Sequence, residues 1–128
     1  MNIVGRILGG AMTPYQKRIY KDPKKAVGWA ITYGQRFPEA EPAIATSPKW
    51  AYNYAKDVIK RGRWPEGEPA IAMDPMWAYK YAEDILGGRF PEGEPAIAKS
   101  PWAGLYLRSF PEAKLEWAMN GLIDWTDL

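Results

Sequence analysis

Residues 63–72 read Arg-Trp-Pro-Glu-Gly-Glu-Pro-Ala-Ile-Ala, and nearly the same ten residues occur at 36–45 and at 89–98. The second copy begins 27 residues after the first, and the third begins 26 residues after the second. A fixed period of this length is typical of stacked repeat proteins, in which each unit contacts only its neighbours. The sequence therefore predicts a repeat architecture before any single helix is assigned.

A second shared stretch lies between these copies. It reads Pro-x-Trp-Ala-Tyr-x-Tyr-Ala-x-Asp at 48–57 and 75–84, with a shortened copy at 101–107 and an eroded one at 23–30. Its apolar residues fill one broad arc at about 100° per residue, as in an amphipathic helix. We interpret its recurring aromatic residues as core residues, namely Trp50, Tyr54, Trp77 and Tyr81.

Residue pairs that favour helix starts occur throughout the chain. A capping residue followed by proline predicts the start of each longer helix, because the cap accepts a backbone N–H and proline suits the first helical position. These pairs are Thr13-Pro14, Asp22-Pro23, Ser47-Pro48, Asp74-Pro75 and Ser100-Pro101. We expect the longer helices to end near Gly62 and Gly87, since glycine commonly follows a helix.

A glutamate–proline pair predicts a second, shorter helix in each unit. One long helix through the unit is disfavoured, because an interior proline costs about 3 kcal/mol. The glutamate lies where the helix dipole favours a carboxylate, and an arginine precedes it by five residues. The expected ion pairs are Arg36 with Glu41, Arg63 with Glu68, Arg89 with Glu94, and Asp57 with Arg61 or Arg63.

These patterns predict an all-α fold of short helical-hairpin repeats of about 26 residues, stacked as a small α-solenoid with capping helices. We assign residues 1–128 to a single domain. Residues 1–35 form an N-terminal cap and a degenerate first repeat, 36–62, 63–88 and 89–109 form repeats, and 110–128 form a C-terminal capping helix and tail. Ile3, Val4, Ile7 and Leu8 are expected to cover the N-terminal end, and a longer closing helix is expected to end near Asn120.

The residue types that are absent argue against catalysis. The chain has no cysteine and no histidine, so it lacks a thiol nucleophile, a thiolate metal ligand and the commonest general base. Paired glutamates that could act as acid and base recur in every repeat, whereas an active site normally occurs once. The sequence therefore predicts a protein that is not an enzyme and that binds no cofactor or metal.

The charge is distributed unevenly along the chain. Residues 1–64 hold twelve Lys and Arg against four Asp and Glu, a charge of +8, whereas residues 65–128 hold five against eleven, a charge of −6. Such a split can steer a partner or favour head-to-tail association. The basic residues that we single out as a candidate binding surface are Lys17, Arg18, Lys21, Lys24, Lys25, Lys60, Arg61 and Arg63.

The two shared stretches, over residues 36–107, resemble a short repeat found in uncharacterised proteins of tailed bacteriophages and some large DNA viruses. The resemblance implies a phage or viral origin and an α-helical repeat fold, and it brings no catalytic residues. Lys25 stands where the pattern has tryptophan, so the first repeat departs from the family pattern.

The sequence predicts a protein that binds a host macromolecule, which is expected to be a host protein. Inhibition of a host defence system, as by an anti-CRISPR protein, is one form of this hypothesis. The alternatives are nucleic-acid binding through the basic N-terminal face and capture of a small anionic nucleotide in a groove lined by arginine and aromatic residues. Self-association is a further alternative.

The N-terminal segment lacks the unbroken apolar run of a signal peptide, and no stretch has the length of a membrane span. We therefore expect no membrane association and a cytoplasmic location, in the host cell for a viral protein.

Overall fold

The computed structural model describes residues 11–127, the last of them by its backbone only. Throughout this range the chain forms helices joined by turns, and none of these residues lies in a β-strand. The prediction of an all-α fold is therefore confirmed. The expected cover of the N-terminal end by Ile3, Val4, Ile7 and Leu8 concerns residues outside this range.

Four of the predicted helices begin directly after their predicted capping residues. They are α1 (Pro14–Ile19), α2 (Pro23–Tyr33), α4 (Pro48–Tyr54) and α6 (Pro75–Tyr81). The side chains of Asp22, Ser47 and Asp74 each accept the backbone N–H of the residue three positions later. Thr13 forms a reciprocal capping box with Gln16. Each helix start is thus fixed by a local hydrogen bond and a proline.

The predicted helix start at Ser100-Pro101 is wrong by two residues. Helix α8 (Ala103–Ser109) follows a turn in which the Ser100 hydroxyl accepts the Trp102 backbone N–H at 3.1 Å. This copy of the repeat has one residue fewer before its tryptophan than the copies at 48 and 75. Trp102 therefore takes the N-cap position that serine or aspartate holds in the earlier copies.

Helices α4 and α6 each continue into a π-helical turn, Ala55–Ile59 (η2) and Ala82–Leu86 (η4). Gly87 ends the second turn in the left-handed conformation, with φ = 60°, as predicted. Lys60 ends the first with φ = 61°, two residues before the glycine that was expected to mark the end. Gly62 lies two residues further on, in the following turn, with φ = 105°.

Replacing Lys60 by glycine should stabilise the protein by about 0.5–1 kcal/mol. Glycine adopts the left-handed conformation without the steric cost that a Cβ atom imposes, although it gains entropy in the unfolded chain. Urea unfolding followed by circular dichroism measures the change. The matched variant Gly87→Lys should lose a similar amount, and a loss of stability in Lys60→Gly would contradict the strained conformation of this lysine.

The predicted shorter helices are confirmed. They are α3 (Glu41–Ile44), α5 (Glu68–Met73) and α7 (Glu94–Ala98), and each follows a 3-10 turn, Pro38–Ala40 (η1), Pro65–Gly67 (η3) or Pro91–Gly93 (η5). The last two turns pack closely against the preceding longer helix. A Cβ atom at Gly93 would lie 2.8 Å from the Ala78 Cβ atom, and one at Gly67 would lie 3.0 Å from the Ala51 Cβ atom.

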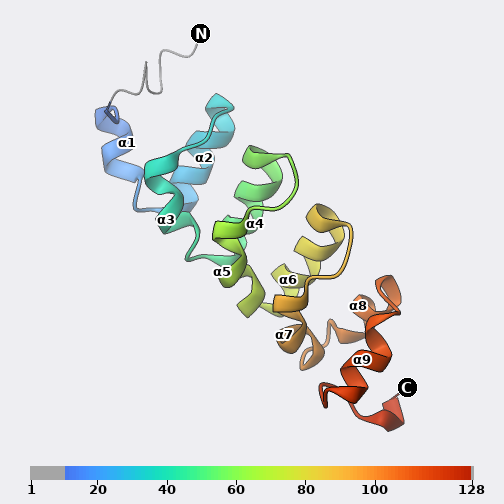
Figure 1. Cartoon of the computed structure of the whole chain (residues 1–128). Coiled ribbons are helices and arrows are strands. Elements are labelled where there is room, and N and C mark those ends of the chain that lie inside the picture. Colours follow the sequence, from blue (N-terminus) through green and yellow to red (C-terminus); the bar gives the residue numbers. More distant parts are fainter. Residues whose placement is uncertain (1–10, 128) are drawn as a thin grey trace.

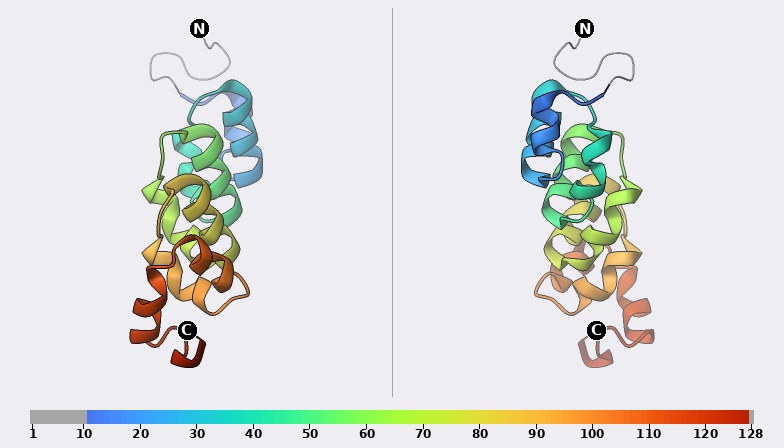
Figure 2. Two further views of the ribbon diagram at one scale, coloured as in Figure 1. Left: turned by 90° about the vertical axis from the view of Figure 1, so that its right-hand side faces the viewer. Right: turned by 90° about the vertical axis from the view of Figure 1, so that its left-hand side faces the viewer.

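The helices form one elongated array (Figures 1 and 2). Helices α2, α4 and α6 lie along one side of it and α3, α5 and α7 along the other. On the first side α4 contacts both α2 and α6, and on the second side α5 contacts α7. Helix α1 lies at one end of the array, and α9 (Ala113–Met119) lies at the other. The closing helix ends where predicted, but with seven residues it is no longer than α8.

A row of buried aromatic pairs forms the core of this array. The ring centroids within each pair lie 4.8–5.0 Å apart, and the pairs are Trp29–Phe37, Tyr54–Trp64, Tyr81–Phe90 and Tyr106–Phe110. Burial of Tyr54 and Tyr81 is therefore confirmed. Trp50 and Trp77 are half-buried and pack against this core without being enclosed by it, so full burial of these two tryptophans is not observed. Both tryptophans lie at the edge of the apolar arc of their helix. Neighbouring helices cover the middle of this arc and leave its edge partly exposed.

Candidate functional site

Arg63, Glu68 and Tyr81 form a hydrogen-bonded cluster between α5 and α6. The Arg63 Nε and Nη2 atoms donate to the two oxygens of Glu68 at 2.9 and 2.8 Å. The Tyr81 hydroxyl donates to Glu68 Oε2 at 2.6 Å and accepts the Trp64 backbone N–H at 2.8 Å. The tyrosine thus links the start of the 3-10 turn to the carboxylate at the start of α5. We call this arrangement a carboxylate cluster.

The same carboxylate cluster occurs twice more in residues 11–127. The equivalent residues are Arg36, Glu41 and Tyr54, with the Phe37 N–H, and Arg89, Glu94 and Tyr106, with the Phe90 N–H. The three predicted arginine–glutamate pairs are therefore confirmed. The expected ion pair of Asp57 with Arg61 or Arg63 is not formed among the described residues, and Arg63 pairs instead with the carboxylate at the start of α5.

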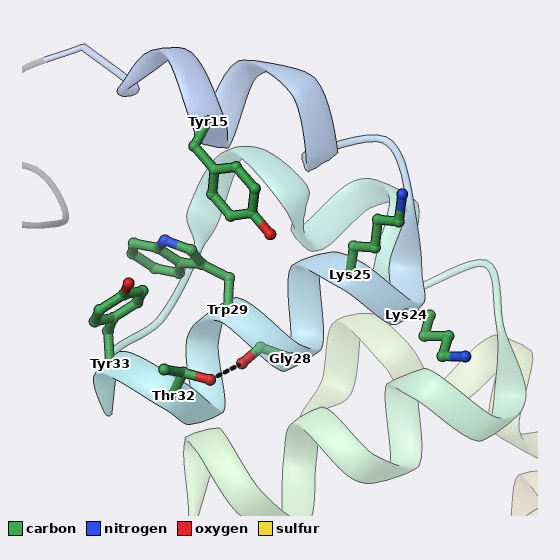
Figure 3. Close-up of a pocket in the computed structure, with 7 residues that line it drawn as sticks. All are labelled: Tyr15, Lys24, Lys25, Gly28, Trp29, Thr32 and Tyr33. Carbon is green, nitrogen blue, oxygen red and sulfur yellow. Dashed lines mark hydrogen bonds between the residues drawn. The ribbon is translucent and has the colours of Figure 1, made fainter.

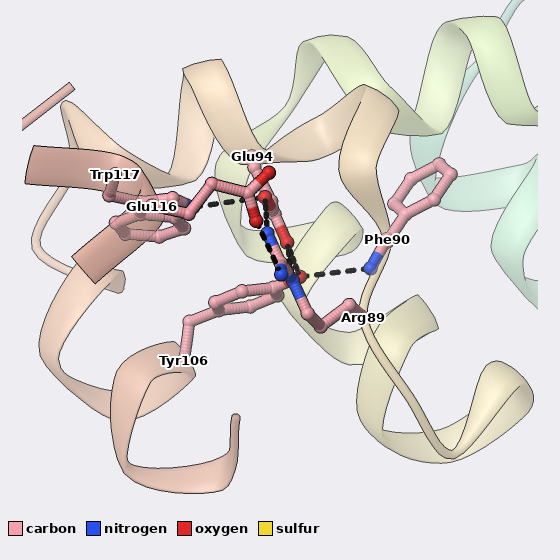
Figure 4. Close-up of polar contacts among 6 residues, drawn as sticks. All are labelled: Arg89, Phe90, Glu94, Tyr106, Glu116 and Trp117. Carbon is pink, nitrogen blue, oxygen red and sulfur yellow. Dashed lines mark hydrogen bonds and ion pairs between the residues drawn. The ribbon is translucent and has the colours of Figure 1, made fainter. Parts of the chain in front are cut away.

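The last cluster is extended by the closing helix (Figure 4). Trp117 of α9 donates its indole N–H to Glu94 at 2.9 Å, and its ring stacks on Tyr106 with centroids 5.3 Å apart. Arg89 also contacts the Glu116 carboxylate at 2.7 Å. The closing helix thus supplies a further donor to the carboxylate of this cluster.

The electrostatics of the clusters favour a structural role. Burial by itself raises the pKa of Glu68, but hydrogen bonds from Arg63 and Tyr81 outweigh it and hold this pKa below its ordinary value of 4.5. Burial and the hydrogen bond to Glu68 raise the pKa of Tyr81 above its ordinary value. At neutral pH the carboxylate is charged and the hydroxyl is neutral. A general acid or base needs a pKa near the working pH, and these groups are moved away from it.

The same pKa shifts predict acid sensitivity. Glu41, Glu68 and Glu94 all have pKa values lowered from 4.5, because hydrogen bonds to the charged form outweigh burial. The stability that they contribute is complete above pH 4.5 and is lost as the pH falls further, since the unfolded chain then takes up protons more readily. Urea midpoints measured from pH 7 to pH 3 should therefore drop below pH 4.5. A constant midpoint over this range would contradict the clusters.

The structure does not gather the eight predicted basic residues on one surface. Lys17 and Arg18 lie on α1, and Lys24 and Lys25 in the first turn of α2. Lys21 lies in the turn between these helices, Lys60 and Arg61 follow η2, and Arg63 belongs to a carboxylate cluster. Helices α2 and α4 run in the same direction in Figure 1, so the turn after η2 lies at the opposite end of the helices from the first turn of α2. Their role in binding stays a prediction.

A hollow of about 560 Å³ lies on α2 at the N-terminal end of the array (Figure 3). Its lining residues are Tyr15, Lys24, Lys25, Gly28, Trp29, Thr32 and Tyr33. Only two of the eight predicted basic residues line it, and the aromatic residues and Gly28 were missed by sequence reasoning. A glycine inside a helix was the available signal, since it costs about 1 kcal/mol relative to alanine and no atom lies within 4 Å of a Cβ built at Gly28.

A second surface feature runs across α4, α6 and the start of α8, and we call it the lysine–aromatic surface. Its residues are Lys49, Trp50, Tyr52, Lys56, Trp77, Tyr79, Lys80 and Trp102. Rings of successive helices pair, Tyr52 with Trp77 at 5.2 Å and Tyr79 with Trp102 at 5.5 Å between centroids. Each pair thus joins a partly exposed tryptophan, Trp77 or Trp102, to a tyrosine of the preceding longer helix.

Each lysine of this surface lies over an aromatic ring. The Nζ atom of Lys49 is 4.8 Å from the Trp50 ring centroid, and that of Lys80 is 5.4 Å from the Trp77 centroid. Lys56 lies 5.9 Å from the ring of Tyr52, which is itself buried. Sequence reasoning missed this surface because it assigned both tryptophans to the core. The tyrosine two residues after each tryptophan could have indicated this surface, since it makes the apolar arc wider than one helix contact needs.

Comparison of the chain with protein-family models, curated proteins and solved structures found no match. Residues 11–127 include no group of histidine, cysteine, aspartate and glutamate that could hold a metal ion. In the same range no helix has the length and apolarity needed to cross a bilayer.

Proposed function

We propose that this chain is a small α-solenoid, with repeats of about 26 residues, that binds a protein partner and catalyses no reaction. The recurring carboxylate clusters and aromatic pairs support the repeat assignment, because each occurs at the same place in successive units. They also support a non-catalytic role, because each carboxylate is already held by an arginine and a tyrosine, and Glu94 by Trp117 as well. Residues 36–62, 63–88 and 89–109 are the proposed repeats.

The lysine–aromatic surface is the observation that carries this proposal. Tryptophan and tyrosine are enriched among the residues that dominate binding energy in protein interfaces. The rings of Trp77 and Trp102 are each held by a tyrosine of the preceding helix, so little side-chain freedom is lost on binding. The surface therefore combines partly exposed rings with an ordered geometry.

The charges of this surface favour an acidic protein as the partner. Lys49, Lys56 and Lys80 surround the rings, and complementary charge speeds association and selects the partner. The resemblance to phage and viral proteins supports a host protein in the cytoplasm, including a component of a defence system such as CRISPR. Nucleic acid is the weaker candidate, because the net charge is only +2 and residues 65–128 carry −6.

Charge reversal on two surfaces tests the proposal. The variant Lys49→Glu/Lys56→Glu/Lys80→Glu changes the lysine–aromatic surface, and Lys17→Glu/Lys21→Glu/Lys24→Glu changes the basic N-terminal end. The wild type and both variants are immobilised, and the proteins that each retains from a bacterial lysate are compared, with and without nuclease treatment of the lysate. The affinity of each retained protein for the wild type and for the variants is then measured by titration. Five of these six lysines are exposed and Lys80 is half-buried, so both variants should fold, and circular dichroism checks this.

The proposal predicts that the lysine–aromatic variant loses about tenfold or more in affinity for a protein that the N-terminal variant still binds. Loss of that protein by the N-terminal variant alone would place the interface on the basic end instead. Retention that disappears with nuclease treatment would show that nucleic acid is the partner, and it would overturn the proposal.

A further inference from the structure

We propose that the hollow on α2 binds a nucleoside monophosphate, with the base at its aromatic end and the phosphate at its lysine end. This site is separate from the lysine–aromatic surface, and the inference does not depend on the proposed protein partner. The hollow is lined by two kinds of side chain, aromatic rings toward one end and two lysines toward the other (Figure 3). A ligand that joins a flat ring to an anionic group would contact both kinds of side chain.

The aromatic end of the hollow is built from three rings on two helices. Trp29 and Tyr33 of α2 lie with their ring centroids 5.2 Å apart at an angle of 52°. Trp29 is only 4% exposed and forms a fixed wall, whereas Tyr33 is 39% exposed and Tyr15 of α1 is 50% exposed. Figure 3 shows the Tyr15 ring reaching from α1 toward this end of α2. Exposed tyrosines beside a fixed indole offer ring faces on which a base can stack.

The other end of the hollow carries the positive charge. Lys24 and Lys25 are exposed and form no ion pair with any residue in the described range. Lys25 precedes Tyr33 by eight residues of one helix, which places their Cα atoms about 12 Å apart. Two positions this far apart on one helix can contact different parts of one small ligand. Lysine ammonium groups bind phosphate as point charges and tolerate small changes in its position.

Gly28 keeps the floor of the hollow open between the two ends. It lies in the middle of α2 with ordinary helical geometry, and a Cβ atom built there would touch nothing in the described chain. The fold therefore does not require glycine at this position, although glycine weakens the helix. A side chain here would project into the space between the lysines and the rings. Close approach of the sugar of a bound nucleotide explains why this position has no side chain.

Isothermal titration with three probes tests the chemical class of the ligand. The probes are AMP, adenosine and inorganic phosphate, each added to the full chain at low salt. We expect AMP to bind at least about tenfold more tightly than adenosine or phosphate, because only AMP engages both ends of the hollow. Equal affinity for AMP and phosphate would show an anion site without base recognition and would overturn the proposal, as would the absence of AMP binding at millimolar concentration.

Paired variants test the location. Lys24→Gln/Lys25→Gln and Gly28→Gln should each weaken AMP binding about tenfold or more. The matched controls are Lys49→Gln/Lys80→Gln, which removes two lysines elsewhere, and Gly104→Gln, since a Cβ atom placed on Gly104 of α8 also meets open space. These controls should bind AMP as the wild type does. Unchanged binding by the hollow variants, or equal losses in the controls, would contradict this site.

Circular dichroism verifies that all four variants fold, and amide chemical-shift changes on AMP addition should centre on residues 24–33.

Discussion

Replacing Trp117 by alanine should destabilise the protein by about 3–5 kcal/mol. The side chain is fully buried, stacks on Tyr106 and donates its indole N–H to Glu94. Its removal leaves a cavity and takes one hydrogen bond from a buried carboxylate. Domains of this size are stable by only about 5–15 kcal/mol, so the variant should melt far below the wild type. Urea unfolding followed by circular dichroism measures the loss.

Two other tryptophans provide the comparison. Trp125 is 56% exposed, and its replacement by alanine should change stability by no more than about 0.5 kcal/mol. The half-buried Trp77 should lie between them, at about 1–2 kcal/mol, because only part of its apolar area is lost from a contact. Its assignment to the core would require the full 3–5 kcal/mol. If Trp125 mattered as much as Trp117, the burial described above would be wrong.

Replacing Tyr81 by phenylalanine should cost about 2–4 kcal/mol, although it removes a single oxygen atom. The Trp64 backbone N–H loses its acceptor, and the buried Glu68 loses a donor. An unsatisfied buried polar group costs about 1–3 kcal/mol, and a charged one costs more. Thermal and urea unfolding measure the effect.

Tyr79→Phe is the matched control for this change. The Tyr79 hydroxyl donates to Glu83 at 2.7 Å on the exposed surface, where water replaces the lost partner. Its removal should therefore change stability by less than about 0.5 kcal/mol. Equal effects of the two tyrosine changes would show that the carboxylate cluster contributes nothing specific to the fold.

The sequence predicted those features that depend on neighbours along the chain. Capping residues before proline located the starts of α2, α4 and α6, because a cap needs only the first helical turn. The pairing of Arg63 with Glu68 followed from a five-residue spacing across one 3-10 turn. The third member of each cluster did not follow from spacing. Tyr81 reaches Glu68 over 13 residues, and this contact depends on how α6 packs against α5.

The features that the sequence missed are set by packing between helices. The period of α4 placed Trp50 and Tyr54 on one apolar arc, but only the neighbouring helices determine how much of that arc is covered. The hollow likewise joins residues of α1 and α2, and its opening depends on the angle between them. Lys60 shows a local limit, because a lysine in the left-handed conformation carries no sequence signal, whereas Gly87 at the equivalent place does.

Amide hydrogen exchange tests the central claim, that one carboxylate cluster repeats along the array to hold its units together. The backbone N–H groups of Phe37, Trp64 and Phe90 precede the 3-10 turns, and each donates to a tyrosine hydroxyl at 2.8–2.9 Å. All three should therefore exchange as slowly as the amides of the longer helices. In Tyr81→Phe the Trp64 amide should exchange rapidly, and those of Phe37 and Phe90 should stay protected. Rapid exchange of these amides in the wild type, or no change at Trp64 in the variant, would contradict the claim.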